Sequence, residues 1–181
     1  KQYYGHSAFR AGQEALIDAI LSGRDALCVM PTGGGKSLCY QIPALLLPGI
    51  TLVVSPLISL MKDQVAALRS AGIPAAYINS SLTSEQIRTV YARTRKGAYK
   101  LIYVAPERLE TNSFLSLMQE INVSFLAVDE AHCISQWGQD FRPSYLGIVD
   151  FLGALPRRPT VAAYTATATK QVQSDILRLL Q

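Results

Sequence analysis

Residues 30–37 of the chain read Met30-Pro31-Thr32-Gly33-Gly34-Gly35-Lys36-Ser37. This stretch stands between an apolar, strand-like segment at 25–29 and an apolar, helix-like segment at 38–47. Glycines let the backbone fold back so that successive N–H groups face one concavity, and the following helix adds its positive N-terminal end. The order of strand, glycine-rich turn and helix therefore predicts a loop that binds phosphate groups.

Two side chains of this loop carry the expected chemistry. Lys36 is expected to place its ammonium on the β- and γ-phosphates of ATP, and Ser37 to give its hydroxyl to the bridging Mg²⁺. The general pattern G-x-x-x-x-G-K-[ST] has glycine where this chain has Met30, so the match is to a variant. A plain glycine-rich turn is the alternative, and the Gly-Lys-Ser that opens a helix directly after a strand argues against it. The expected nucleotide contacts in the loop are Thr32, Gly33, Gly34, Gly35, Lys36 and Ser37.

Composition narrows the class of protein. A length of 181 residues, 49% of them hydrophobic and 17% charged, fits one compact domain. The sequence shows neither an apolar run of the ~20 residues that a membrane helix needs nor a signal-peptide pattern, so we expect no membrane partner and a location in the cytosol, the bacterial nucleoid or, in a eukaryote, the nucleus. The net charge of +4 permits contact with nucleic-acid phosphates, but a solvated basic surface explains it equally well.

Cysteine spacing and the chain ends add two expectations. Three cysteines without C-x-x-C spacing argue against a disulfide framework and against a zinc site. The chain begins at Lys1 and stops inside a helix-like stretch at 171–181, so we expect residues 1–181 to be one domain of a longer protein.

Apolar runs rich in β-forming residues alternate with segments of helical periodicity. The runs lie at 26–30, 51–55, 75–79, 100–104, 124–128 and 160–164. Helices are expected at 12–22, 36–46, 57–71, 83–96, 113–120, 144–154 and 169–180. This alternation predicts an α/β fold with a mainly parallel sheet and helices on both faces, and ligands bind such sheets at the carboxyl ends of the strands.

Two adjacent carboxylates, Asp129 and Glu130, follow the apolar run at 124–128. At a strand end of a phosphate-loop protein, Asp129 is expected to join Ser37 in the Mg²⁺ shell, and Glu130 to orient or deprotonate the water that attacks the γ-phosphate. Acidic residues also favour the first turn of a helix, which is the alternative for an isolated pair. The phosphate loop upstream favours the catalytic interpretation.

The segment at 133–145 has neither helical nor strand periodicity and is expected to form a loop. It carries Trp137, Phe141 and Arg142, which offer two ring faces and a guanidinium plane. Such side chains stack on unpaired bases and hold a phosphate backbone without reading its sequence. The alternative is that Trp137 and Phe141 anchor the loop to the core.

Taken together, these residues resemble the RecQ family of superfamily 2 DNA helicases along the whole chain. The aromatic-rich loop at 133–145 is the most specific element of the resemblance. The other matching stretches are 4–13, similar to the adenine-reading motif, 30–37 to motif I, 54–64 to motif Ia, 103–109 to motif Ib, 129–132 to motif II and 165–168 to motif III. The resemblance implies a RecA-like domain, the first of the two motor domains of such a helicase.

The resemblance also implies roles for residues that the other patterns leave undecided. Gln13 is expected to hydrogen-bond the adenine edge, with His6 and Arg10 beside the base or ribose, although an exposed helix start is the alternative for Gln13 and Arg10. His6 stands where the family often has an aromatic ring, and Gln139 where it commonly has His. The expected DNA contacts are Ser55, Ser59, Lys62 and Arg108, for which capping and solvated charge are the alternatives. The residues expected to couple the two sites are His132, Thr165 and Thr167, and strand-end capping is the alternative for the two threonines.

The resemblance implies a protein that hydrolyses Mg-ATP to move 3′-to-5′ along single-stranded DNA and to unwind forked DNA. A second RecA-like domain must then supply an arginine finger, so residues 1–181 alone are expected to turn over little ATP. The rival hypothesis is a nucleic-acid-binding module with a vestigial nucleotide site. A small-molecule kinase is disfavoured because it gives the aromatic-rich loop no role.

Overall fold

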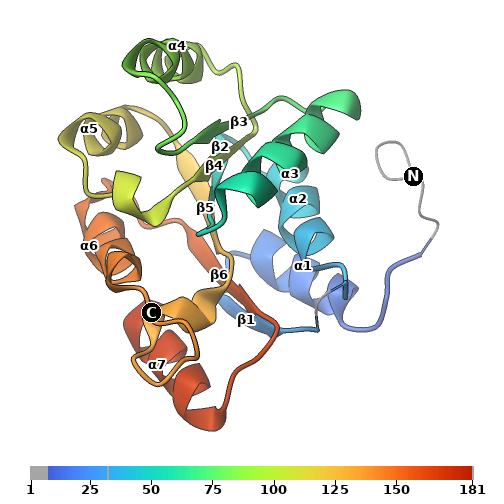
Figure 1. Ribbon diagram of the computed structural model, residues 1–181. Helices are drawn as coiled ribbons and strands as arrows, with labels where there is room; N and C mark the ends of the chain where they lie inside the picture. Colours follow the sequence, from blue (N-terminus) through green and yellow to red (C-terminus); the bar gives the residue numbers. More distant parts are fainter. Residues whose placement is uncertain (1–7, 32, 181) are drawn as a thin grey trace.

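The computed structural model describes residues 8–31 and 33–180. Within these residues, six strands form one parallel sheet in the order β1-β6-β5-β2-β4-β3 (Figure 1). The strands are β1 (Ala26–Val29), β2 (Ile50–Val54), β3 (Ala75–Ile78), β4 (Leu101–Val104), β5 (Val123–Val128) and β6 (Thr160–Thr165). The order of the strands reverses between β1 and β2, where β6 and β5 intervene, so this part of the sheet is where a ligand crevice is expected.

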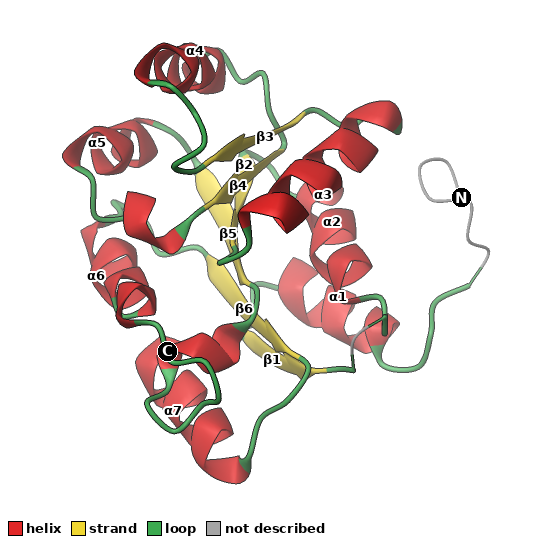
Figure 2. Ribbon diagram, viewed as in Figure 1, coloured by secondary structure: helices red, strands yellow, loops and turns green. Residues whose placement is uncertain are grey.

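The helices of the described chain form two layers, one on each face of the sheet (Figure 2). One layer contains α1 (Gln13–Leu21), α2 (Lys36–Leu46) and α3 (Ile58–Ser70). The other contains α4 (Ser84–Arg95), α5 (Asn112–Glu120), α6 (Gly147–Ala154) and α7 (Lys170–Leu180). Three single-turn 3-10 helices complete the described structure: η1 (Pro106–Arg108), η2 (Ala131–Ile134) and η3 (Pro143–Tyr145).

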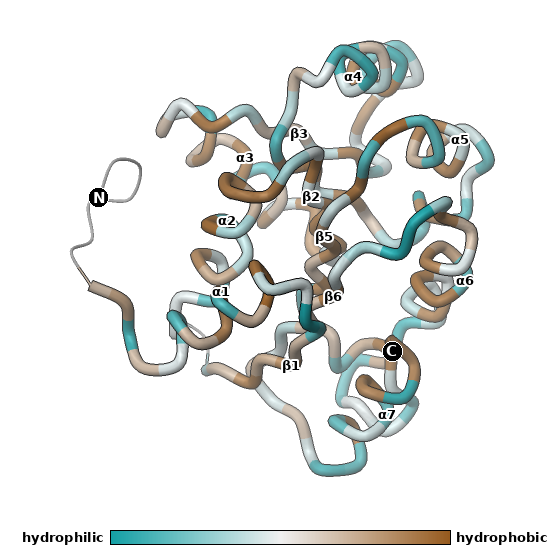
Figure 3. The backbone as a smooth tube through the Cα atoms, turned by 180° about the vertical axis from the view of Figure 1, so that it is seen from behind, coloured by the Kyte–Doolittle hydropathy of each residue, from teal (hydrophilic) through white to brown (hydrophobic). Residues whose placement is uncertain are grey.

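Each layer of helices encloses its own apolar core, because successive residues of a strand point to opposite faces of the sheet. Val53 packs with α1, α2 and α3, whereas its neighbours Leu52 and Val54 pack with the other layer. The strands are therefore apolar on both faces, which Figure 3 shows as brown segments through the middle of the molecule. Burial on both faces is the reason why the strands appear in the sequence as continuous apolar runs.

The α/β fold, the parallel sheet and the helices on both faces are confirmed, with boundaries that differ from the expected ones by at most three residues. The largest difference is the helix expected at 144–154, which begins at Gly147 because the preceding residues form η3. Pro143 opens η3, where its missing N–H costs no hydrogen bond. Within the described part of the chain, none of the helices combines the length and the apolarity needed to cross a membrane.

Candidate nucleotide site and nucleic-acid interface

The phosphate loop, the acidic pair and Thr165 meet at the carboxyl edge of the sheet. The register pairs Val29 with Thr165, and the Met30 N–H donates to the carbonyl oxygen of Thr165 at 3.0 Å. On the other side, the Asp129 N–H donates to the carbonyl oxygen of Val54 at 2.9 Å. The strand order thus brings Met30 beside Thr165, 135 residues later in the sequence, and Val54 beside Asp129, 75 residues later.

Gly35 forms the boundary between the phosphate loop and α2. Its φ of 86° lies in the left-handed region that favours glycine, and α2 begins at the next residue, Lys36. A Cβ on Gly35 would meet the side-chain amide of Gln13, which would have to shift from its place on the loop. Lys36 and Ser37 thus lie in the first turn of α2, half-buried, where its amide groups and dipole favour an anion.

Gln13 and Arg10 hold the phosphate loop from the N-terminal side. The Gln13 side chain is buried, its Nε2 donates to the Gly35 carbonyl at 3.2 Å, and its Oε1 accepts from the Arg10 N–H at 2.8 Å. The Arg10 guanidinium donates to the carbonyl of Gly33 at 2.7 Å. The exposed helix start proposed as an alternative for Gln13 is therefore wrong, and its contact with adenine stays a prediction. His6 and Thr32 lie outside the described residues.

Asp129 is a buried carboxylate with an unusual pKa. Burial, followed by the charge of Glu130, raises the pKa of Asp129 from 3.8 to about 6, while nearby Lys36 lowers it only in part. Glu130 has a φ of 48°, the one positive φ of a non-glycine residue in the described structure. Because a left-handed conformation costs energy outside glycine, this turn is held in place by its surroundings. The alternative that the pair merely starts an α-helix is not what is observed, because the single 3-10 turn η2 follows it.

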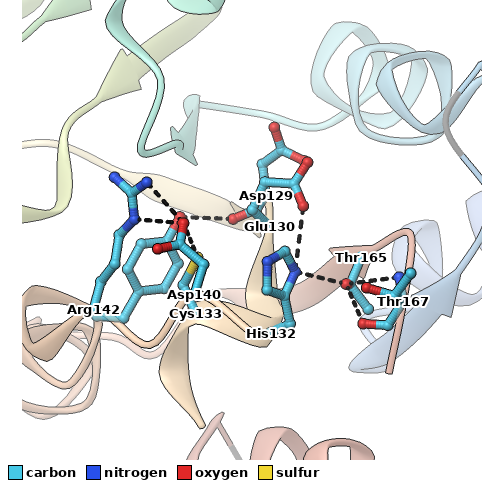
Figure 4. Close-up of polar contacts among 9 residues, drawn as sticks. Asp129, Glu130, His132, Cys133, Asp140, Arg142, Thr165 and Thr167 are labelled. Atoms are coloured by element: carbon cyan, nitrogen blue, oxygen red, sulfur yellow. Dashed lines mark hydrogen bonds and ion pairs between the residues drawn. The ribbon is translucent and has the colours of Figure 1, made fainter. Parts of the chain in front are cut away.

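His132 connects the acidic pair to the end of β6. Its Nδ1 lies 3.3 Å from the Glu130 carboxylate and 2.9 Å from the Thr165 hydroxyl, so the ring stands between the two (Figure 4). The Thr165 hydroxyl also donates to the carbonyl of Thr167 and accepts from its N–H. The three residues expected to couple the sites thus form one hydrogen-bonded chain. The capping suggested for Thr165 exists as well, because it closes the turn after β6.

Tyr145 is a site residue to which the sequence analysis gave no role. Its ring is fully buried, and its hydroxyl donates to the carbonyl oxygen of Asp129 at 2.8 Å. Burial and the neighbouring thiol of Cys133 raise the pKa of Tyr145, which keeps the hydroxyl protonated. A tyrosine at the end of an otherwise polar loop was the available signal, since buried tyrosine hydroxyls need a partner.

The residues at this edge fit a magnesium ion with a nucleotide. A carboxylate whose neighbour is a second carboxylate, and whose pKa is raised by burial, is an oxygen ligand that a hard cation stabilises. Gly34 belongs to a loop so close-packed that a Cβ there would lie 2.9 Å from the Pro31 carbonyl oxygen. The Gly34 N–H donates to the same Pro31 carbonyl at 3.0 Å, so the loop turns back on itself directly before α2, as the strand-turn-helix geometry of a phosphate loop requires.

The aromatic-rich loop exposes one ring and tethers the charges around it. Trp137 is 73% exposed, so its proposed anchoring to the core is wrong, whereas Phe141 is half-buried. The Arg142 guanidinium is bound to the carboxylate of Asp140 at 2.8 and 3.0 Å (Figure 4). A Cβ on Gly138 would collide with the carbonyl of His132, so the loop closes in a tight turn behind Trp137.

The four other residues expected to contact DNA divide into exposed and buried ones. Ser59 and Lys62 are exposed on α3, and Arg108 is half-buried in η1. Ser55 corrects the sequence analysis, because it is 1% exposed and its hydroxyl has no hydrogen-bond partner among the described residues. It directly follows β2, in register with Asp129 after β5, so its hydroxyl belongs to the interior of the edge and not to a surface that DNA can touch.

This arrangement of sheet, phosphate loop and acidic pair is that of a nucleotide-dependent motor domain, and comparison with known proteins identifies the family. The model of the DEAD/DEAH box helicases matches residues 10–175. The chain therefore belongs to the DEAD/DEAH box helicase family.

Within this family, the similarity is to RecQ helicases, as the aromatic-rich loop predicted. The chain is 52% identical to the ATP-dependent DNA helicase RecQ of Bacillus subtilis, over 98% of this chain and 30% of that protein. It is 54% identical to the ATP-dependent DNA helicase RecQ of Haemophilus influenzae, over 99% of this chain and 29% of that protein. The chain thus spans about 30% of the length of these relatives.

Solved helicase structures share the fold. The chain superposes on the Hef helicase domain of Pyrococcus furiosus with a TM-score of 0.72 and 23% identity, over 94% of this chain and 36% of that one. For the helicase Lhr of Mycobacterium smegmatis, determined with ssDNA and AMP-PNP, the TM-score is 0.74 with 20% identity, over 96% of this chain and 24% of that one. The RecA-like fold expected from the resemblance is confirmed.

Proposed function

We propose that this chain is the ATP-binding motor domain of a RecQ-like, ATP-dependent 3′-to-5′ DNA helicase. The observation that carries the proposal is the meeting of Lys36 and the buried Asp129 at one edge of the sheet, followed in the same loop by an exposed turn at residues 135–138, the Trp137 turn. Names of relatives support it, because the similar proteins of Bacillus subtilis and Haemophilus influenzae are both ATP-dependent DNA helicases. Such a protein works where DNA is, in the nucleoid or the nucleus.

On the nucleotide side, each residue has a separate task. The first turn of α2 receives the phosphates, with the Lys36 ammonium on the β- and γ-phosphates. Ser37 and Asp129 hold Mg²⁺, which neutralises charge on the phosphate oxygens when bound. Glu130 accepts a proton from the attacking water, and its own neighbour His132 holds its carboxylate in place.

On the DNA side, Trp137 stacks on unpaired bases because its ring is largely in solvent. Ser59, Lys62 and Arg108 contribute phosphate contacts from α3 and η1, and Arg142 joins them by exchanging Asp140 for a phosphate. Glu130, His132, Thr165 and Thr167 form a hydrogen-bonded chain. Through this chain, the state of the γ-phosphate is coupled to the DNA side.

The proposal is tested by titrating Mg-ATP into the wild-type chain and into Lys36→Ala, with thermal shift and a fluorescent ATP analogue as readouts. Lys96→Ala is the matched control, because this exposed lysine ends α4 far along the sequence from the loop. We expect binding by the wild type and the control and loss of binding by Lys36→Ala, as for removal of a charged group from a phosphate. Binding by none of the three proteins would support the rival module with a vestigial nucleotide site, and equal affinity of all three would refute the assignment of the phosphate loop.

A further inference from the structure

The base of the Trp137 turn is attached to α7 by a buried hydrogen bond. The hydroxyl of Ser135 donates to Asp175 Oδ2 at 2.7 Å, and the two residues are 1% and 8% exposed. The same hydroxyl accepts the N–H of Trp137 at 3.2 Å. A serine hydroxyl has one hydrogen and two lone pairs, so donating to the carboxylate leaves the oxygen free to receive this N–H. Asp175 thus orients the Ser135 hydroxyl, and this hydroxyl in turn binds the backbone N–H of Trp137.

A second attachment makes this bond part of a rigid unit. His132 lies in η2 and Ser135 directly follows it, and His132 is bound to Thr165 at 2.9 Å. Thr165 ends β6, and Asp175 lies in α7, the helix that follows β6 in the chain. The η2 turn and the residue that follows it are therefore bound to consecutive elements, His132 to the end of β6 and Ser135 to α7. A single contact would leave the turn free to pivot, whereas two contacts define its orientation.

The Asp175 carboxylate is held as a charge-assisted acceptor. Its second oxygen, Oδ1, accepts from Arg178 Nη2 at 3.2 Å one turn further along α7. The Ser135 hydroxyl, followed by Arg178, keeps the pKa of Asp175 below its usual value, so the group is ionised at neutral pH. Hydrogen bonds to a charged acceptor are shorter and stronger than neutral ones. At the other end of this chain of bonds, the ring of Trp137 stays in solvent.

We propose that Asp175 is a positioning residue for the Trp137 turn, holding Ser135 so that the turn presents its ring in a fixed orientation. Asp175 lies outside every stretch that matched a helicase motif, and the partners of its carboxylate are Ser135 and Arg178. The part of this proposal that concerns DNA rests on the proposed function of the turn. The fixed orientation itself does not, so the two can be measured separately.

The chain contains a single tryptophan, so its fluorescence reports the turn alone. We would measure the steady-state anisotropy of Trp137, without DNA, in Asp175→Ala, in Ser135→Ala and in the double variant. The control is Asp150→Ala, an exposed aspartate on α6. We expect the anisotropy to fall in both single variants and to fall no further in the double variant, since both remove one chain of bonds. Unchanged anisotropy, or two independent losses that add, would overturn the proposal.

Circular dichroism shows whether each variant is folded. If Asp175→Ala fails to fold, Ser135→Ala and Asp175→Asn still decide the question. Ser135→Ala removes only the hydroxyl, while Asp175→Asn keeps the shape of the side chain and weakens the acceptor. We then expect a fall for Ser135→Ala and a smaller fall for Asp175→Asn, and no fall in either would overturn the proposal.

Titration with oligothymidylate tests the part that concerns DNA. Loss of one hydrogen bond to a charged group should weaken the binding of DNA about tenfold in both single variants and not in the control. Lower anisotropy with unchanged DNA affinity would overturn the positioning role for DNA. If the emission of the wild type does not respond to DNA at all, the proposed function fails, while the anisotropy without DNA still decides the role of Asp175.

Discussion

The phosphate loop with its acidic pair and the Trp137 turn lie near the same edge of the sheet but are built in opposite ways. At the nucleotide end, buried polar groups are not fully compensated by neighbours. Asp129 is buried beside a second carboxylate, and Ser55 has a buried hydroxyl without a partner in the described chain. In the turn, Asp140 satisfies Arg142, Asp175 satisfies Ser135, and an apolar ring is left in solvent.

This difference indicates two kinds of binding site. At the nucleotide end, burial disfavours the charge of Asp129, and a bound cation with phosphates would relieve that electrostatic cost. The turn carries little internal cost, because its charges are already paired, and it offers a stiff aromatic platform. Substitutions at the first site should therefore trade function against stability, whereas substitutions of the exposed ring should change binding alone.

The largest effect is expected on the rate of ATP hydrolysis when a second RecA-like domain is absent. A RecA-like motor needs a second domain to close over the nucleotide and supply an arginine finger, an element that contributes about 10³–10⁵ in rate in comparable enzymes. On the proposed function, we expect the 181-residue chain to release phosphate from ATP slower than a RecQ helicase with both motor domains by about that factor, with or without DNA. Rapid, DNA-stimulated phosphate release by the short chain would contradict this dependence.

The next largest effect is expected for Asp129→Asn, which should gain stability and lose function. Because its pKa rises from 3.8 unfolded to about 6 folded, the folded state binds the proton more tightly, and stability falls as the pH rises through this window. Asp129→Asn avoids this loss and should raise the free energy of unfolding of the nucleotide-free chain by up to about 3 kcal/mol at pH 7. The gain should vanish below about pH 4, where the wild-type carboxyl is protonated in both states.

Urea unfolding of wild type and Asp129→Asn at pH 4 and pH 7 measures the change in the free energy of unfolding. Thermal shift with Mg-ATP measures the change in nucleotide binding. Asp63→Asn, at an exposed position of α3, serves as the control and should change neither stability nor nucleotide binding. If Asp129→Asn destabilises the nucleotide-free chain at pH 7, the nucleotide end is not under electrostatic strain and the contrast between the two sites is wrong.

Trp137→Ala should show the opposite behaviour. Stacking of one base on an aromatic ring contributes about 1–3 kcal/mol to the binding of single-stranded DNA, so affinity should fall by about 5- to 150-fold. The thermal midpoint should stay the same, because the ring is 73% exposed. Leu46→Ala, a change at a 66% exposed apolar residue at the end of α2, should alter neither quantity. Fluorescence polarisation of a labelled oligonucleotide measures the affinity, and a fall in stability without a fall in affinity would identify Trp137 as structural.

The smallest effect is expected at Tyr145, whose hydroxyl joins the two regions through the carbonyl of Asp129. Tyr145→Phe keeps the buried ring and removes one hydrogen bond, which should cost about 1 kcal/mol of stability and leave DNA affinity unchanged. Tyr91→Phe, at the α4 end of the same core, is the matched control. An unchanged free energy of unfolding in Tyr145→Phe, measured in urea, would mean that this bond does not support the acidic pair.

The sequence predicts the phosphate loop better than it predicts the bonds that shape the Trp137 turn. The strands and helices follow from periodicity, and the phosphate loop from Gly-Lys-Ser between a strand and a helix, since these are local patterns. The bonds that shape the turn are not local: Ser135 meets Asp175 forty residues later, and His132 meets Thr165. Neither pair has a periodic or spaced signature.

Burial explains the remaining errors of the sequence analysis. Ser55 was expected to contact DNA because a hydroxyl after a strand suits a phosphate, but this residue, which directly follows β2, is only 1% exposed. For Gln13 the alternative to an adenine contact was an exposed helix start, yet the left-handed turn at Gly35 brings the loop onto its side chain. In both cases the neighbour that decides exposure comes from a different part of the chain, so composition around the residue could not predict it.

On the proposed function, Glu130 acts on the water that attacks ATP, while groups other than Glu130 bind the nucleotide at the same edge of the sheet. The most direct test is the rate of phosphate release by the full-length helicase with single-stranded DNA, for wild type, Glu130→Gln and the exposed control Glu85→Gln. We expect Glu130→Gln to lower the rate about 10²- to 10⁴-fold while Mg-ATP and DNA still bind, because only the proton acceptor is lost. A rate near that of the wild type, or a loss of rate explained by lost nucleotide binding, would contradict the account.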